Sequence, residues 1–288
     1  MKVLLLGRHG QVSQELQRAL HGAAELTVLG REQLDLAQPE RIRQQVQHLS
    51  PELIINAAAH TAVDQAESEP ELAFAINATA PGILAEAAAE LSVPLIHYST
   101  DYVFDGNHAE PYRENDATKP LSVYGRSKLA GEQAIQAVGG MHLILRTSWV
   151  YSQHGKNFLL TMQRLLQERE NLSVVDDQIG APTWAGTIAQ VTAQLITQWR
   201  SGHPGPWGVY HLTAQGETSW FGFASAIAAH LHSQGKTVAT LHPIPSSAYP
   251  TPAQRPLNSR LDCSRLQQDW QVQLPTWQAA LEQCLAHR

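Results

Sequence analysis

The stretch Val3-Leu4-Leu5-Leu6-Gly7-Arg8-His9-Gly10-Gln11-Val12-Ser13 decides the fold. Its four apolar residues end at a glycine, which is typical of a buried parallel strand, and Leu16 and Leu20 then continue with helical spacing. A strand, a glycine-containing turn and a helix form the context of a dinucleotide-binding turn, where N–H groups at the helix N-terminus face a pyrophosphate. Ser13 stands at the third glycine position of that fingerprint, so the motif is a weak one.

The same rhythm of short apolar strand and helical segment continues through the first half of the chain. The further strands that we expect are residues 26–29, 53–56, 93–99 and 142–146. Five alternations of strand and helix predict a parallel sheet with right-handed crossovers. We therefore expect an α/β protein, with a doubly wound parallel Rossmann sheet and a smaller, mixed α/β substrate-binding domain.

The rhythm changes after Tyr151, which suggests how the chain divides. We assign to the Rossmann domain residues 1–150, about 178–200 and, as an open alternative, part of 236–260. We assign to the smaller domain about 151–177, 201–235 and 261–288. Residues 242–256 hold five prolines, and because proline lacks an N–H, we expect a long irregular loop there.

Composition limits the classes of partner. The 288 residues are 43% hydrophobic and 16% charged, which is enough for a sizeable core. The net charge is −6 and no Lys/Arg run occurs, which argues against nucleic-acid or anionic-membrane partners. Two cysteines, Cys263 and Cys284, fit a reducing compartment, and no apolar run approaches the length of a membrane span. We expect a cytoplasmic protein.

Tyr124 and Lys128 stand four residues apart in a segment that predicts a helix, so they lie on one face. A phenol has an ordinary pKa of about 10, and a nearby ammonium lowers that pKa. The pair is therefore a candidate acid/base unit. The spacing alone favours the plainer interpretation, a solvated helix face. Thr100, just past the fourth predicted strand, adds a hydroxyl near the same sheet edge.

Three other polar positions have two interpretations each. Arg31 lies where a 2′-phosphate is expected and Glu32 where a ribose hydroxyl is expected, and either is otherwise a solvated loop charge. Asn77 lies inside a predicted helix, where asparagine is unfavourable, so it faces water or serves a site.

A set of motifs spans nearly the whole chain. They are Gly7-x-x-Gly10-Gln11, Asn56-Ala57-Ala58-Ala59-His60-Thr61-Ala62-Val63-Asp64-x-Ala66-Glu67, Tyr98-Ser99-Thr100-Asp101-Tyr102-Val103-Phe104-Asp105-Gly106, Tyr124-Gly125-x-x-Lys128-x-x-Gly131-Glu132, Arg146-Thr147-Ser148-Trp149-Val150-Tyr151, Gly180-Ala181-Pro182-Thr183 and Arg255-Pro256-x-Asn258-Ser259-x-Leu261-Asp262. In this order the set resembles the short-chain dehydrogenase/reductase superfamily, in its extended, sugar-nucleotide branch. Within that branch it resembles the dTDP-4-dehydrorhamnose reductase family.

The resemblance implies a hydride transfer from a nicotinamide cofactor to the C4 ketone of dTDP-4-dehydro-L-rhamnose, giving dTDP-L-rhamnose for cell-surface polysaccharide. It makes Tyr124 the proton donor, Lys128 the residue that holds the nicotinamide ribose, and Thr100 a hydrogen-bond donor to the reacting oxygen. The implied cofactor-binding residues are Gly7, Gly10, Gln11, Val12, Asp35, Leu36, Ala59, His60, Thr61, Tyr124 and Lys128. The implied substrate-binding residues are Thr100, Asp101, Tyr102, Trp149, Arg255, Asn258 and Arg260. Because Arg31 lies near the expected 2′-phosphate, we favour NADPH, with NADH as the alternative.

The sequence departs from the family at a metal site. Some members bridge a homodimer through a divalent metal held by carboxylates, and Glu15 matches the first ligand. Gly186 and Gln278 stand where glutamates are expected. A lone carboxylate is a poor Mg²⁺ site, so we expect neither Mg²⁺ nor a metal-bridged dimer. Two other functions remain open: a non-catalytic subunit like the regulatory β subunit of methionine adenosyltransferase, and a related sugar-nucleotide epimerase or dehydratase.

Overall fold

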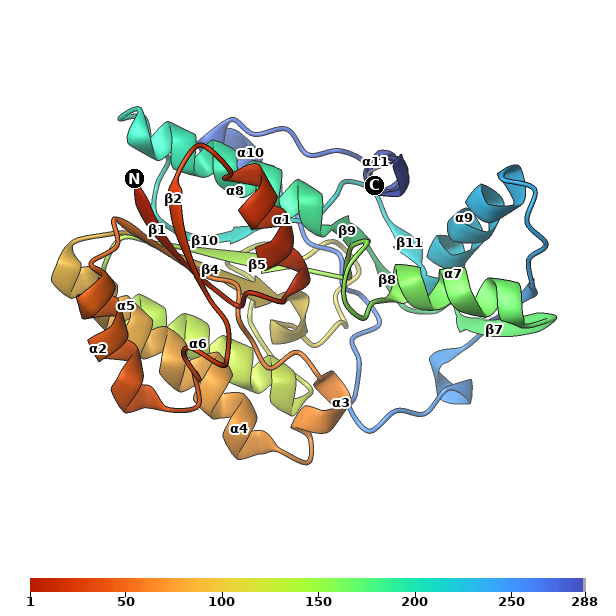
Figure 1. Ribbon diagram of the computed structural model, residues 1–288. Coiled ribbons are helices and arrows are strands. Elements are labelled where there is room, and N and C mark those ends of the chain that lie inside the picture. The colour runs from red at the N-terminus through yellow and green to blue at the C-terminus, as the bar shows by residue number, and fades with distance from the viewer. Residues whose placement is uncertain (287–288) are drawn as a thin grey trace.

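The computed structural model describes residues 1–286, and a six-stranded sheet forms its centre (Figure 1). The strand order is β10-β5-β4-β3-β1-β2. The strands are β1 (Lys2–Leu6), β2 (Glu25–Leu29), β3 (Leu53–Asn56), β4 (Leu95–Thr100), β5 (His142–Thr147) and β10 (Gly208–His211). Neighbouring strands pair in parallel, which confirms the predicted doubly wound sheet. The carboxyl ends of the strands therefore meet at one edge, where ligands of such sheets bind.

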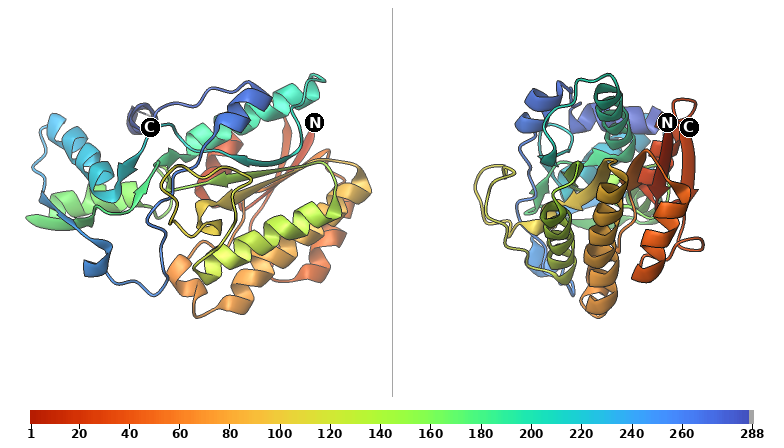
Figure 2. Two further views of the ribbon diagram at one scale, coloured as in Figure 1. Left: turned by 180° about the vertical axis from the view of Figure 1, so that it is seen from behind. Right: turned by 90° about the vertical axis from the view of Figure 1, so that its left-hand side faces the viewer.

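Helices cover both faces of this sheet, as the two views in Figure 2 show. On one face lie α1 (Gln11–Ala19), α8 (Ala185–Arg200) and α10 (Ser264–Trp270), and on the other lie α2 (Pro39–Leu49), α5 (Ala80–Leu91) and α6 (Val123–Val138). Val3 and Leu5 belong to the first core, and Leu4 and Leu6 belong to the second. Burial on both faces explains why β1 is apolar at successive positions.

The helical stretch that leads to β4 is interrupted. It consists of α4 (Pro70–Phe74), a π-helical turn (Ala75–Thr79) and α5, and α3 (Val63–Ala66) precedes it. By length and composition alone, Pro70–Leu91 is the one helical stretch among residues 1–286 that could span a membrane. Half of that window is buried inside the protein. The stretch packs beside α2 and α6, as a core helix does.

A smaller layer lies beyond the carboxyl edge of the sheet, at the right of Figure 1. Its elements are β6 (Val150–Tyr151), α7 (Phe158–Glu168), β7 (Asn171–Val175), β8 (Ile179–Gly180), β9 (Thr183–Trp184), β11 (Thr218–Ser219), α9 (Trp220–Ser233), β12 (Thr240–Ile244) and α11 (Trp277–Ala286). These elements enclose a separate hydrophobic core, in which Phe223, Trp184 and Trp277 are buried. The layer mixes helices with two-stranded ribbons, as expected.

Two sequence-based expectations about this half need correction in part. Residues 201–235 and 261–288 were assigned to the smaller domain, but β10 pairs with β5 in the main sheet and α10 packs against that sheet. The helices α9 and α11 of the same ranges contribute to the core of the smaller layer. The strand after α8 continues the βα alternation, so the Gly/Pro-rich segment before it is a turn. Residues 242–256 were expected to lack regular structure, yet β12 pairs with β7 through Pro243. A proline is tolerated there because β12 is an edge strand.

Candidate active site

The turn between β1 and α1 is shaped to let another backbone come close. Gly7 has φ +99°, and a Cβ atom on it would lie 2.8 Å from the carbonyl oxygen of Ala57. Only glycine fits both the left-handed backbone and that contact. The turn therefore packs directly against the chain leaving β3, and the two segments together line the sheet edge.

The N-terminus of α1 has free donors. Gly10 is its N-cap and supplies no side-chain cap, and the first backbone bond inside the helix runs from Gln14 N–H to Gly10. The N–H groups of Gln11, Val12 and Ser13 are thus oriented out of the helix end, as an anion requires. Ser13 is fully buried, so its small side chain fits at the third glycine position. These features suit a dinucleotide pyrophosphate.

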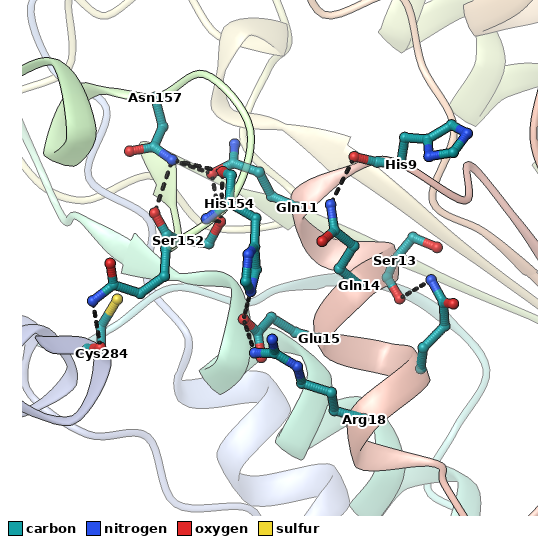
Figure 3. Close-up of polar contacts among 12 residues, drawn as sticks. His9, Gln11, Ser13, Gln14, Glu15, Arg18, Ser152, His154, Asn157 and Cys284 are labelled. Carbon is teal, nitrogen blue, oxygen red and sulfur yellow. Dashed lines mark hydrogen bonds and ion pairs between the residues drawn. The ribbon is translucent and has the colours of Figure 1, made fainter. Parts of the chain in front are cut away.

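The side chain of Gln11 ties this helix end to the smaller layer (Figure 3). Its Oε1 accepts hydrogen bonds from Ser152 Oγ at 3.1 Å and Asn157 Nδ2 at 2.9 Å. Asn157 also caps α7 through its Oδ1. Gln11 was predicted as a cofactor contact through its position, and the structure shows that its side chain joins the two layers.

Glu15, the candidate metal ligand, has side-chain neighbours within this chain. It is buried, and its Oε1 lies 3.4 Å from Arg18 Nη1 and 3.6 Å from His154 Nε2 (Figure 3). Among residues 1–286 no group of three metal-ligating side chains is present. Gly186 and Gln278 supply no carboxylate near it.

The segment after β2 holds the residues expected at the adenosine end. Arg31 is largely exposed, and its Nε donates to Asp35 Oδ2 at 3.3 Å. Arg8 reaches the same strand, because its Nη2 donates to the carbonyl of Val28 in β2 at 2.6 Å. Glu32 faces Arg8 and His9, and a backbone hydrogen bond together with these neighbours lowers its pKa. Each of these two guanidinium groups thus lies against a carboxylate of the same segment.

Asn77 does not face water but holds two segments together. It is fully buried in the π-helical turn, and its Oδ1 accepts from His60 N–H at 2.8 Å. Its Nδ2 donates to the His60 carbonyl at 3.0 Å and to Ser127 Oγ at 3.0 Å. The asparagine therefore fastens the predicted cofactor segment Ala59–Thr61 to α6. Irregular π-helical turns are common at functional sites.

Thr100, Asp101 and Tyr124 meet at the end of β4. Thr100 Oγ1 donates to Asp101 Oδ1 at 3.0 Å. Burial raises the pKa of Asp101 to about 6, although its hydrogen bonds with Ser259 and Thr100 act to lower that pKa. The ring of Tyr124 lies edge-on to Tyr102, with centroids 5.4 Å apart. Burial also raises the pKa of Tyr124, while a hydrogen bond with Thr100 opposes that shift.

The expectation that Lys128 lowers the pKa of Tyr124 is wrong for this arrangement. Lys128 is buried, and its Nζ donates to the Tyr98 carbonyl at 2.7 Å and lies 3.2 Å from His97 Nε2. The Lys128 ammonium is thus bonded to residues of β4. A raised phenol pKa keeps Tyr124 protonated at neutral pH, which is the form that a proton donor needs.

Trp149 stands in the left-handed region at φ 49°, an uncommon backbone for a tryptophan. Its indole covers Gly180, where a Cβ atom would lie 2.6 Å from Trp149 Cε2. It also stacks on Trp220, with centroids 3.6 Å apart and planes 10° apart. Gln178 accepts a hydrogen bond from Trp220 Nε1 at 3.1 Å. A strained backbone held in this way is typical of a functional side chain.

The predicted arginines are already paired. Arg255 donates to Asp64 Oδ2 at 2.8 Å and to Tyr102 Oη at 3.2 Å, which brings the C-terminal loop to the end of β4. Arg260 donates to Glu217 and to the side chain of Asn258. Asn258 in turn donates to the carbonyls of residues 108 and 110. Of the two arginines, Arg255 is the one bonded to Tyr102, whose ring lies against Tyr124.

Comparison with known proteins now decides the family. A family model described as RmlD substrate binding domain matches residues 1–288. The chain is 47% identical to the dTDP-4-dehydrorhamnose reductase of Escherichia coli strain K12, over 99% of this chain and 97% of that protein. The chain belongs to the dTDP-4-dehydrorhamnose reductase family.

Solved structures agree with this membership. A dTDP-4-dehydrorhamnose reductase from Bacillus anthracis, in complex with NADP, superposes with a TM-score of 0.92 at 34% identity, covering 100% of this chain and 99% of that one. A Thermus thermophilus UDP-glucose 4-epimerase in complex with NAD has a TM-score of 0.79 at 19% identity, covering 100% of this chain and 98% of that one. The second likeness shows the fold alone.

Sequence reasoning missed several residues of this reductase-family site. Trp220 backs Trp149, Asp64 pairs with Arg255, and His97 contacts Lys128. A histidine inside an otherwise buried strand was a readable signal for His97. The other two contacts join segments far apart in the chain, so spacing alone does not reveal them.

We expect Trp220→Ala to raise the KM for the nucleotide sugar by up to about tenfold, because an aromatic stack contributes roughly 0.5–1.5 kcal/mol. Trp149 would lose the partner that holds its indole, while the cofactor turn is untouched. Steady-state kinetics with varied sugar nucleotide measure the effect, and NADPH affinity should stay constant. Trp220→Phe keeps a stacking ring and should recover most of the loss. Equal KM values for all three proteins would show that the stack does not position Trp149.

Proposed function

We propose that this protein reduces the C4 ketone of dTDP-4-dehydro-L-rhamnose to dTDP-L-rhamnose, with NADPH as the reductant. The observation that carries the proposal is the hydrogen bond between Tyr124 and Thr100 at the end of β4, with Lys128 of the same helix bonded to the Tyr98 carbonyl of that strand. The substrate is supported by family membership. The NADP complex of the Bacillus anthracis relative supports the cofactor.

The cofactor site fits a dinucleotide. The close approach at Gly7 and the free N–H groups of α1 would hold the pyrophosphate, and Ala59, His60 and Thr61 would border the rest. Asp35 and Leu36 would border the adenine. When bound, the reduced nicotinamide supplies the hydride. Lys128, fixed on β4 by the Tyr98 carbonyl, would hold the nicotinamide ribose.

The chain's own residues would complete the reaction. Tyr124, kept protonated by its raised pKa, would give its proton to the oxygen that becomes the alcohol. Thr100 would rotate its hydroxyl from Asp101 toward the same oxygen, an interaction that strengthens as negative charge builds up there. Asp101, Tyr102 and Trp149 would contact the sugar. Arg255, Asn258 and Arg260 would lie toward the nucleotide, and Arg255 is the one that we place on the diphosphate.

The smaller layer would form the sugar side of the site, since Trp149 and Trp220 face each other across its boundary. We also place the enzyme in the cytoplasm without a nucleic-acid or membrane partner, because its net charge is −6 and it has no Lys/Arg run. A homodimer, if formed, would not be bridged by Mg²⁺, because Glu15 is paired within the chain.

The deciding experiment mixes purified protein with dTDP-4-dehydrorhamnose and NADPH and follows loss of the reduced nicotinamide absorbance. We expect NADPH to be consumed in stoichiometric amounts with formation of dTDP-L-rhamnose. An epimerase or dehydratase would regenerate its cofactor and consume none. Absorbance that stays constant while NADPH binds would instead favour the non-catalytic subunit.

The preference for NADPH has its own prediction. We expect Arg31→Ala to lower the ratio of kcat/KM for NADPH over NADH by about tenfold, because a hydrogen bond to a charged group contributes roughly 1.5–3 kcal/mol. Arg113→Ala is a matched control, since Arg113 is equally exposed and also pairs with an aspartate, Asp262. An unchanged ratio in the Arg31 variant would leave the preference without a basis in this residue.

A further inference from the structure

His97 lies behind the proposed active site and has no role in the mechanism given above. It sits on β4 with no exposed surface. Its Nε2 lies 3.2 Å from Lys128 Nζ, and its Nδ1 lies 3.1 Å from Asn56 Nδ2. The imidazole is thus held between a lysine of α6 and an asparagine of β3.

Both ring nitrogens of His97 face nitrogen atoms that can donate, and a neutral imidazole accepts at only one of them. A lysine ammonium can only donate, so His97 Nε2 must accept. Burial and the neighbouring charge of Lys128 lower the pKa of His97 well below its usual range, so the ring is neutral and carries one proton. That proton then lies on Nδ1, facing Asn56. A half-turn of the Asn56 amide presents its oxygen to this proton, at the cost of the 3.2 Å bond from Ala58 N–H.

We propose that His97 is a positioning residue for the reduction, which accepts a hydrogen bond from Lys128 and holds its ammonium at the carboxyl end of β4. The proposal rests on the proposed function, in which Lys128 binds the cofactor. Two of the three Nζ donors are satisfied by His97 and the Tyr98 carbonyl. An ammonium has three donors, so one remains for a ligand.

The charge of Lys128 depends on the same contact. Burial lowers the pKa of Lys128 to about 8, and the charge of Glu132 raises it. The titratable groups that act on the ammonium are His97 from β4 and Glu132 from α6. Glu132 is itself bonded to Arg146 of β5, so part of its field is neutralised. Removing the acceptor at His97 withdraws a hydrogen bond that favours the charged lysine.

The experiment compares His97→Leu with His97→Gln, whose amide oxygen can accept in place of Nε2. In the ligand-free protein, NMR titration of labelled lysine measures the pKa of Lys128. We expect His97→Leu to lower it by about one unit, to move the alkaline limb of kcat/KM by the same amount, and to lower kcat about tenfold. KM for the nucleotide sugar should not change, and His97→Gln should recover most of the loss.

Wild-type protein gives a reading without any substitution. Nitrogen NMR of labelled histidine should show His97 neutral with its proton on Nδ1, and a proton on Nε2 would overturn the proposal. The proposal would also be overturned if the pKa of Lys128 stayed unchanged in folded His97→Leu, or if His97→Leu and His97→Gln had equal effects. Either result is what a residue that only supports the fold would give. These readings need no substrate, so an inactive wild type would count against the proposed function and not against this inference.

Discussion

Tyr124→Phe should lower kcat by about a thousandfold or more, because general acid catalysis contributes roughly 10²–10⁴-fold. The substitution removes the phenolic proton and keeps the ring that lies edge-on to Tyr102. Since the hydroxyl contributes to proton donation more than to cofactor binding, the Kd for NADPH should change little. Steady-state turnover and cofactor fluorescence titration measure the two quantities.

The pH dependence follows from the direction of the shift. Burial raises the pKa of Tyr124, so the acid form is complete at neutral pH and is lost only as the pH rises through that raised value. Activity in the wild type should therefore fall on the alkaline side, where Lys128, with a pKa of about 8, also loses its charge. Tyr210→Phe is the matched control, because Tyr210 is a buried tyrosine of β10 bonded to Pro206 and Asp269. Unimpaired kcat in Tyr124→Phe would remove Tyr124 as the proton donor.

The sequence predicts the sheet well because its signals are local. The apolar run of β1, the glycine turn and the end of β3 at Asn56 each follow from neighbouring residues, and the structure has them in place. The spacing of Tyr124 and Lys128 also places both on one helix. What spacing does not give is the direction of the lysine, which bonds to β4 rather than to the tyrosine.

Contacts between distant segments escape the sequence for a physical reason. Trp220 follows β11, which pairs with β8, and a two-residue ribbon has almost no sequence pattern that would predict its stack on Trp149. The place of β10 in the main sheet was missed for a similar reason. A Gly/Pro-rich loop can lead into a new domain or into a further strand of the same sheet, and its sequence does not distinguish the two. Asn77 had two open interpretations, and burial against His60 and Ser127 decided between them.

Glu132→Leu should lower the free energy of unfolding by about 3–5 kcal/mol, since it leaves a buried arginine without its counter-charge. Arg146 Nε donates to Glu132 Oε1 at 2.9 Å and Nη2 donates to Oε2 at 2.6 Å, with both residues buried. Phe104 covers the guanidinium, with Cζ 5.2 Å from the ring centroid. Denaturant unfolding measures the loss, which is a large part of the roughly 5–15 kcal/mol typical of a whole domain.

Two controls separate the buried pair from ordinary ion pairing. Glu132→Leu with Arg146→Met removes both charges and should recover most of the stability, because no charge is then left unpaired. Glu168→Ala breaks the exposed pair with Arg164 and should cost at most about 1 kcal/mol. If Glu132→Leu cost no more than Glu168→Ala, the pair would not support the fold. The charge of Glu132 also raises the pKa of Lys128, so both Glu132 variants should titrate Lys128 at lower pH, and only the single variant should be unstable.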